Sequence, residues 1–317
     1  MKNNYNFSST KRITQIVSLC KIKIQRTLCH FFILLVCLIG FCELAYCQNT
    51  KEIKSKMKIT TQLKKTGLKL QLIRNATMKL TYAGKTFLTD PMFSAKGTFE
   101  PFAGIARNPT IDLPIESNEI LKRIDCVIVS HLHPDHFDQF AIKVISKQIP
   151  VFCQAGDNDN ILANGFNNVI SIENSYTWDG IEITRIGGKH GRGKILEFMG
   201  KVSGFVFQAK GEPTIYWIGD SIWCDEVKNA IEKYNPDIII THSGGAKIPN
   251  FEKILMDGKE TLTICNLNSN AVIVAVHLES LDHCTVSRKN LREMADKEKI
   301  SPSRLLIPED GETIVFE

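Results

Sequence analysis

Residues 126–138 read CVIVSHLHPDHFD, and this stretch decides the fold. The apolar run Cys126–Val129 is typical of a buried strand. The eight residues after Ser130 contain three histidines and two aspartates. Burying such groups is costly unless a partner satisfies them. A metal ion at the end of the strand is such a partner, so the stretch predicts a metal-binding loop.

Three further polar residues follow apolar stretches in the same way. His190 ends IEITRIGGKH, Asp220 ends TIYWIGD and His277 ends AVIVAVH. Because strand ends at one edge of a sheet share a surface, residues far apart in sequence can meet there. This donor set suits zinc, iron or manganese, and its size favours two ions that share a carboxylate. The candidate metal ligands are therefore seven residues: His131, His133, Asp135, His136, His190, Asp220 and His277.

The same residues resemble a known family. HxHxDH at positions 131–136, followed by a distant histidine, an aspartate after a strand and a final histidine, resembles the metallo-β-lactamase superfamily from Leu68 to the C-terminus. Residues 75–93, NATMKLTYAGKTFLTDPMF, resemble the branch that includes ascorbate-6-phosphate lactonase and N-acyl-phosphatidylethanolamine phospholipase D. That branch usually has Gly-His-Ala-Thr where this chain has Arg74-Asn75-Ala76-Thr77, so the chain departs from the branch pattern at two positions.

The resemblance implies a dinuclear metal site, and we expect two zinc ions per chain, with Mn²⁺ or Fe²⁺ as alternatives. His133 argues against the oxygen-reducing di-iron members, whose pattern resembles HxExDH. The resemblance assigns the first ion to His131, His133 and His190. It assigns the second ion to Asp135, His136 and His277. Asp220 would bridge the two ions.

The implied chemistry is hydrolysis of an ester, a lactone or a phosphoester, since a pair of cations can lower the pKa of a bound water to about 7. A metal-bound hydroxide would attack, and Asp135, which would orient the water, and Asp220 are the expected catalytic residues. Asp90 is a candidate hydrogen-bond acceptor for a ligand imidazole. The alternatives are a non-catalytic metal-binding protein of the same fold and an iron-dependent redox enzyme.

Two other histidines compete with His277. His242 ends DIIITH, and His283 lies six residues after His277. We expect His277 to be the ligand because it directly terminates its strand, as the resembling motif requires. His242 and His283 have two open interpretations, contact with the substrate and a structural role.

The alternation of strands and helices from Leu68 onward predicts an α/β fold, a four-layer αββα sandwich of the metallo-β-lactamase type. Strands are expected at 68–73, 76–83 and 85–90, and VSGFVFQAK and TIYWIGD predict a hairpin. The periodicity predicts a helix from about His136 to Gln148. In the long loop Pro91–Pro114, Phe93, Phe99 and Phe102 predict either a lid over the substrate or an inward-packed loop.

The N-terminal segment has the features of an export signal. Residues 1–47 carry six Lys or Arg and one acid, and the apolar run Phe31–Cys42 precedes AYCQ, which suits cleavage after Cys47. A short extension, 48–66, then leads to the hydrolase domain, 67–317. Export to the periplasm or medium is therefore expected, with membrane contact only through the leader or a lipid anchor on Cys47. If translation starts at Met57, the protein is cytoplasmic.

The rest of the chain is electrically balanced. After Cys47 it carries 33 basic and 33 acidic residues, so the overall positive charge does not indicate a nucleic-acid partner. We expect a small-molecule substrate. The five cysteines after Cys47 are widely spaced in or near apolar runs, which predicts isolated thiols rather than disulfides.

Overall fold

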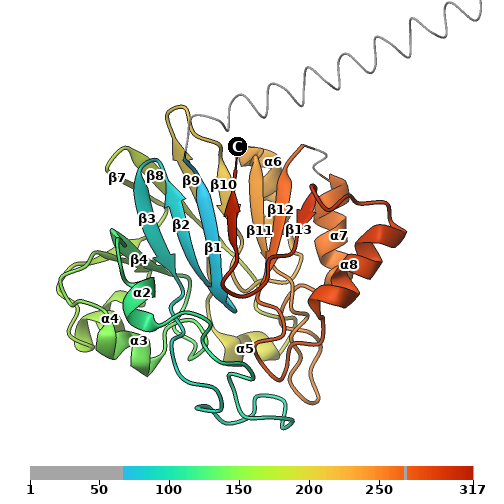
Figure 1. The fold of residues 1–317 in the computed structure, drawn as a ribbon, viewed down its shortest axis with the longest axis horizontal. Helices are drawn as coiled ribbons and strands as arrows, with labels where there is room; N and C mark the ends of the chain where they lie inside the picture. The colour runs from blue at the N-terminus through green and yellow to red at the C-terminus, as the bar shows by residue number, and fades with distance from the viewer. Residues whose placement is uncertain (1–66, 268–269, 317) are drawn as a thin grey trace, which may run out of the picture. The chain divides into compact units, whose positions relative to one another are not determined.

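A computed structural model describes residues 67–267 and 270–316 (Figure 1), so the predicted leader and extension lie outside the described residues. The described residues form two seven-stranded sheets. The first sheet has the order β14 (Thr313–Val315), β1 (Lys69–Arg74), β2 (Thr77–Tyr82), β3 (Lys85–Thr89), β4 (Cys126–Val129), β5 (Val151–Gln154) and β6 (Val169–Ile172). The second has the order β13 (Leu305–Leu306), β12 (Val272–Val276), β11 (Ile238–His242), β10 (Ile215–Trp217), β9 (Ser203–Ala209), β8 (Ile181–Gly187) and β7 (Ser175–Trp178).

Each sheet combines an antiparallel part with a parallel part. Strands β14, β1, β2 and β3 pair antiparallel, and β3 to β6 pair parallel. Ala83 and Gly84 both adopt positive φ in the turn between β2 and β3, as a tight hairpin turn requires. In the second sheet β9 and β10 form the predicted antiparallel hairpin, and β10 to β13 pair parallel. The predicted strands of the N-terminal hairpins are therefore confirmed.

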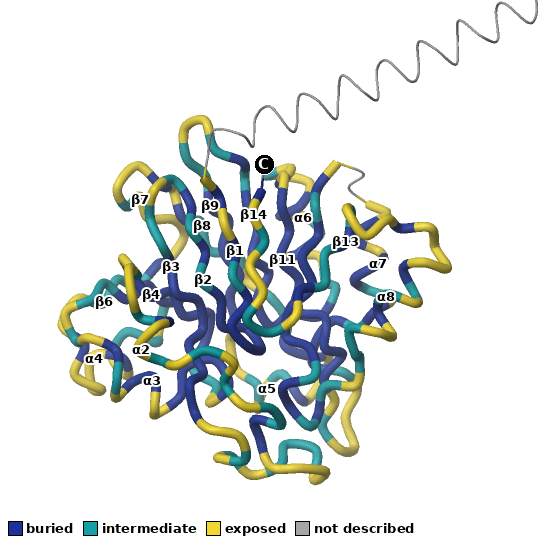
Figure 2. Tube along the Cα trace, viewed as in Figure 1, coloured by how far each residue is buried: buried dark blue, intermediate teal, exposed yellow. Residues whose placement is uncertain are grey.

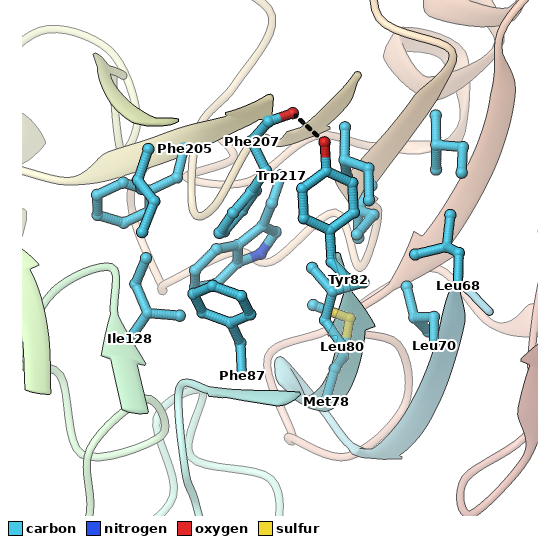
Figure 3. Close-up of a cluster of buried hydrophobic side chains, with 14 of the residues drawn as sticks. Leu68, Leu70, Met78, Leu80, Tyr82, Phe87, Ile128, Phe205, Phe207 and Trp217 are labelled. Atoms are coloured by element: carbon cyan, nitrogen blue, oxygen red, sulfur yellow. Dashed lines mark hydrogen bonds between the residues drawn. The ribbon is translucent and has the colours of Figure 1, made fainter. Parts of the chain in front are cut away.

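The hydrophobic core lies between the two sheets. Phe87 of β3 packs edge-on against Phe207 of β9, with ring centroids 5.2 Å apart, and both belong to one buried cluster with Trp217 (Figure 3). The Tyr82 hydroxyl, which burial would leave unsatisfied, donates a hydrogen bond to the Phe207 carbonyl at 3.3 Å. Figure 2 shows that buried stretches concentrate in the strands of both sheets.

Helices cover the outer face of each sheet over two further apolar clusters. The first sheet is covered by α2 (Ser117–Ile120), α3 (Gln139–Val144) and α4 (Asn158–Ala163). The second is covered by α6 (Asp225–Tyr234), α7 (Gly258–Leu267) and α8 (Arg288–Lys297). Helix α5 (Ile195–Met199) lies among the loops below the lower ends of the strands in Figure 1. The predicted four-layer αββα sandwich is confirmed.

Helix α3 is shorter than the predicted span of His136 to Gln148. It begins at Gln139 because the Asp138 carboxylate accepts a hydrogen bond from the Ala141 N–H at 2.6 Å and caps it. The preceding residues form a turn in which the His136 N–H donates to the His133 carbonyl at 2.9 Å. The helix ends before Ile145, whose backbone is extended.

Other elements have no counterpart in the sequence predictions, namely β7 and the helices α2, α4, α5 and α7. Helices α2, α4 and α5 span four to six residues, too few to show a helical period. No helix among the described residues has the length and apolar character needed to cross a membrane.

Candidate metal centre

The structure brings together all seven residues predicted as metal ligands. They follow strands of both sheets, in the loops at the lower end of the strands in Figure 1. All are buried except His133, which is half-buried. Within each of two groups, atoms able to bind a metal lie within 4.8 Å of one another: His131, His133 and His190 in the three-histidine group, and Asp135, His136, Asp220 and His277 in the carboxylate group.

Asp220 lies between the two groups. Its Oδ2 is 3.2 Å from Nε2 of His136 and 3.5 Å from Nε2 of His190, so one oxygen reaches members of both groups. Strand β10 ends at Trp217, and the turn that follows passes through Gly219 at a φ of +72°. A Cβ at Gly219 would lie 2.5 Å from the Ser203 carbonyl oxygen, so only glycine fits this turn before Asp220.

The imidazoles of the cluster are oriented from outside. Nδ1 of His190 lies 2.8 Å from the Ile254 carbonyl oxygen, an acceptor only, so this nitrogen donates. Nδ1 of His131 lies 2.9 Å from the Ser130 hydroxyl, and Nδ1 of His136 lies 2.6 Å from Oδ2 of Asp90. Hydrogen bonds at Nδ1 of these three rings leave their Nε2 atoms to bind a metal, an arrangement common among metal-binding histidines.

The site passes a test that does not depend on the motif. Nε2 of His136 is buried and has no hydrogen-bond partner, although Asp135 and Asp220 each place an oxygen 3.2 Å away. A buried, unpaired imidazole nitrogen is costly. A metal ion would satisfy this nitrogen and the surrounding oxygens together, so the residues present fit a metal.

Comparison with known proteins identifies the family. The model of the β-lactamase superfamily domain matches residues 69–277. The chain belongs to this superfamily. It is 38% identical over 250 residues to the UPF0173 protein YddR of Bacillus subtilis, covering 77% of this chain and 98% of that protein. It is also 32% identical over 114 residues to N-acyl-phosphatidylethanolamine-hydrolyzing phospholipase D 1 of Caenorhabditis elegans, covering 33% of this chain and 31% of that protein.

Two solved structures share both the sequence and the fold. A possible metal-dependent hydrolase from Veillonella parvula has a TM-score of 0.76 at 35% identity, covering 78% of this chain and 98% of its own. The isothiocyanate hydrolase from Delia radicum gut bacteria has a TM-score of 0.73 at 35% identity, covering 78% of this chain and 99% of its own. The protein is thus a metal-dependent hydrolase of the metallo-β-lactamase fold.

Asp90 organises one side of the centre in this superfamily member. Its carboxylate accepts hydrogen bonds from the Ser130 N–H at 2.7 Å and the Ser130 hydroxyl at 2.6 Å, besides that from His136. The predicted hydrogen bond from an imidazole of the cluster to Asp90 is confirmed. Ser130, to which no sequence pattern pointed, connects Asp90 to His131 and so links the two groups.

His242 does not touch the pocket but supports Asp220. The indole N–H of Trp217, a donor only, lies 2.9 Å from Nε2 of His242, which must therefore accept. The proton of the neutral ring is then on Nδ1, which donates to Oδ1 of Asp220 at 2.6 Å. This hydrogen bond holds Oδ1 in place while Oδ2 faces the two groups. The structural interpretation of His242 is the correct one.

Asn75, where the branch pattern has histidine, joins two loops of the carboxylate group. Its side-chain Nδ2 donates to the backbone carbonyl of Asp135 at 3.1 Å, and its backbone carbonyl accepts from the backbone N–H of His277 at 3.0 Å. Asn75 adopts a φ of 60°, a conformation that asparagine tolerates better than most residues. The departure from the branch pattern was therefore the one sequence signal for this contact.

The two groups differ in charge. Burial lowers the pKa of His190 to about 4, and burial together with the neighbouring imidazoles lowers the pKa of His131. Burial by itself would lower the pKa of His277, but the charge of Asp220 and the hydrogen bond with Asp135 outweigh burial and raise this pKa to about 10. Burial raises the carboxylate pKa values, yet the charge of His136 outweighs it, and both Asp135 and Asp220 have pKa values well below the usual range.

A pocket of about 380 Å³ opens over the centre. Metal-cluster residues form its floor, and its walls are mostly apolar: Pro101, Phe102, Pro134, Met199, Ile248 and Ile254. No lysine or arginine lines it among the described residues. Arg192 stays outside, half-exposed, with its guanidinium 3.2 Å from the Trp223 carbonyl oxygen.

Two phenylalanines of the loop Pro91–Pro114 lie in different environments, and His283 lies beside one of them. Phe93 is buried in the core under α3, as the inward-packed interpretation predicts, whereas Phe102 lines the pocket, as the lid interpretation predicts. His283 also lines the pocket, with its ring centroid 5.2 Å from that of Phe102. The five described cysteines are free, as predicted.

Proposed function

We propose that the enzyme binds two zinc ions through the seven predicted ligands and hydrolyses a small uncharged electrophile, either an isothiocyanate or a carboxylic ester or lactone. One observation supports this proposal above others: seven imidazole and carboxylate donors converge beneath an apolar pocket whose described lining contains no lysine or arginine, and four of them line it, namely His133, Asp135, His190 and Asp220. Both groups would be filled, with Asp220 shared between them.

The residue at position 133 favours zinc. Nitrogen and oxygen donors suit zinc, iron or manganese, but His133 stands where the oxygen-reducing di-iron members, whose pattern resembles HxExDH, have a glutamate. Bound zinc supplies Lewis-acid polarisation of an electrophile and lowers the pKa of water to about 7. The 35% identity to a possible metal-dependent hydrolase from Veillonella parvula supports hydrolysis over the iron-dependent redox alternative.

The chain's own residues orient the reactants. Asp135 lines the pocket, and its low pKa keeps the carboxylate ionised, so it can accept a hydrogen bond from the attacking water. Asp220 stays in place because His242 donates to its Oδ1. The apolar walls, among them Phe102 and Ile254, exclude bulk water from the centre.

The pocket walls favour uncharged substrates over phosphoesters. A phosphodiester carries a negative charge that lysine or arginine commonly helps to bind beside the metal ions, and the described lining of the pocket contains neither residue. The isothiocyanate hydrolase that is 35% identical to this chain supports a heterocumulene as substrate. Addition of water to its central carbon gives a thiocarbamic acid, which breaks up into an amine and carbonyl sulfide.

The test combines metal content with a substrate panel. The full chain, purified without chelator, should contain about two zinc ions by elemental mass spectrometry. It should then release amine from phenethyl isothiocyanate, or product from p-nitrophenyl acetate or a γ-lactone. Asp220→Asn is the matched control and should lose this activity. Activity on bis(p-nitrophenyl) phosphate alone would contradict the choice of an uncharged substrate, and protein that binds no zinc would contradict the metal site.

A further inference from the structure

A second hollow adjoins the pocket over the metal centre. A groove of about 330 Å³ is lined on its apolar side by Ala103, Ile105, Pro249 and Phe251, and its polar side contains Lys247, Asn250, Asp282 and Thr285. The groove and the pocket share two lining residues, Ile248 and His283. The two hollows are therefore adjacent, and the groove lies within reach of a ligand that is bound at the metal centre and extends past His283.

Hydrogen bonds to Asp282 fix the loop that borders both the pocket and the groove. The Asp282 carboxylate accepts hydrogen bonds from the backbone N–H groups of Phe102 at 3.0 Å, Ala103 at 3.1 Å and Ile105 at 3.1 Å, and from the Asn108 amide at 2.8 Å. Asp282 lines the groove, but these donors already occupy its carboxylate oxygens. The loop that carries Phe102 is thus tied to the segment that carries His283.

Two large apolar side chains of the groove are exposed. Ile105 is 77% exposed and Phe251 is 41% exposed. A single exposed apolar side chain is ordinary, but these two border one groove that joins the pocket. Covering them with an apolar ligand would remove their surface from water, which favours binding.

His283 lies at the junction with an unused hydrogen-bonding atom. The side chain is 7% exposed, and its Nδ1 is buried without a hydrogen-bond partner. Its ring packs edge-on against Phe102. The ring of His283, packed against Phe102, therefore forms an edge shared by the pocket and the groove that an apolar ligand tail would pass.

We propose that the groove is a tail subsite: the substrate carries its reactive group at the metal centre and an apolar chain or aryl group that passes His283 and covers Ile105 and Phe251. This inference rests on the proposed function, because it takes the seven-residue cluster as the place of the reactive group. It narrows the substrate class from small uncharged electrophiles to those with an apolar tail.

The experiment uses two metal-chelating probes that differ only in their tails. Acetohydroxamic acid and decanohydroxamic acid carry the same chelating head, and titration calorimetry gives the Kd of each for the zinc-loaded full chain. For the wild type we expect decanohydroxamate to bind at least about tenfold more tightly, because its chain is buried in the groove.

The double variant Ile105→Ser, Phe251→Ser removes the exposed apolar surface of the groove. The ratio of the two Kd values should fall to about threefold or less. Leu162→Ser is the matched control: Leu162 is a 46% exposed apolar residue of α4 that lines neither hollow, and its loss should leave the ratio unchanged. Both sets of substitutions replace exposed side chains, so folding is preserved.

The outcomes separate this inference from the proposed function. Equal affinity of the wild type for both probes, with acetohydroxamate bound, overturns the tail subsite and leaves the metal centre standing. An unchanged ratio in the double variant also overturns it, because the tail then lies elsewhere. If neither probe binds the zinc-treated chain, the metal centre itself is overturned, and the tail subsite with it.

Discussion

The three-histidine group and the carboxylate group of the candidate centre lie side by side but differ in charge. The first offers imidazoles, and burial lowers the pKa of His131 and His190. The second places Asp135 and Asp220 beside histidines whose pKa values these carboxylates raise. The same ring therefore favours the neutral form in one group and the protonated form in the other. The difference lies in the neighbours of each ring, not in its residue type.

Asp220 is a member of the carboxylate group whose Oδ2 also lies 3.5 Å from His190 of the three-histidine group, so Asp220→Ala should have the largest effect. We expect activity to fall on the order of a thousandfold or more, because both groups lose a shared oxygen. The fold should persist, since His136 and His277 can release protons once the carboxylate is gone. Turnover, zinc content and circular dichroism measure the three expectations. Retained activity would remove Asp220 from the bridging role.

His242→Phe removes the hydrogen bond to Oδ1 of Asp220 while keeping Asp220 itself, and so tests how much this hydrogen bond contributes to metal binding. We expect zinc affinity to fall about 10–100-fold, as for other residues that orient metal ligands. Loss of the acceptor for the Trp217 indole should also lower the free energy of unfolding by about 1–3 kcal/mol. Competition with a chromogenic chelator measures the affinity. Trp217→Phe is the matched variant, which keeps the His242–Asp220 hydrogen bond and should lose less affinity.

Proton release on zinc binding should differ between the groups. The pKa of His277 is raised from 6.5 to about 10, so at pH 7 the metal-free protein holds this proton and zinc must displace it. His190, with a pKa of about 4, has no proton to release at pH 7. Calorimetry in buffers of different ionisation enthalpy counts the protons. His277→Ala should lower the count by about one, and His190→Ala should not. Equal losses in the two variants would contradict the charge difference between the groups.

The same raised pKa has a consequence for stability. A histidine whose pKa is higher in the folded state stabilises the fold through its proton, fully below pH 6.5 and progressively less as the pH rises to about 10. The metal-free protein should therefore lose thermal stability over this window. Zinc-loaded protein, in which metal replaces the proton, should lose less.

His283→Ala should have the smallest effect on the centre. We expect zinc content to stay at the wild-type level and kcat/KM to fall about tenfold or less, because His283 lines the pocket but belongs to neither group. Elemental analysis and initial rates measure both. Loss of one zinc ion per chain would instead make His283 a ligand in place of His277.

Much of the fold and of the candidate site could be predicted from the sequence, because the signals are local. Strand β4 and the HxHxDH loop lie within 13 residues, so their chemistry is visible in one stretch. Hairpins such as β2–β3 carry their own turn residues. The ends of α3 could not be read in the same way, because the turn that holds His136 competes with the helical period.

Three features depended on the tertiary structure. His242 and His277 both end apolar strands, yet only the strand order places His277 beside Asp135 and turns His242 toward Trp217. Asn75 joins two distant loops, and the groove forms where separate loops pack against each other. The physical reason is the same each time: spacing along the chain determines which groups a loop presents, while distances between loops depend on how the two sheets pack.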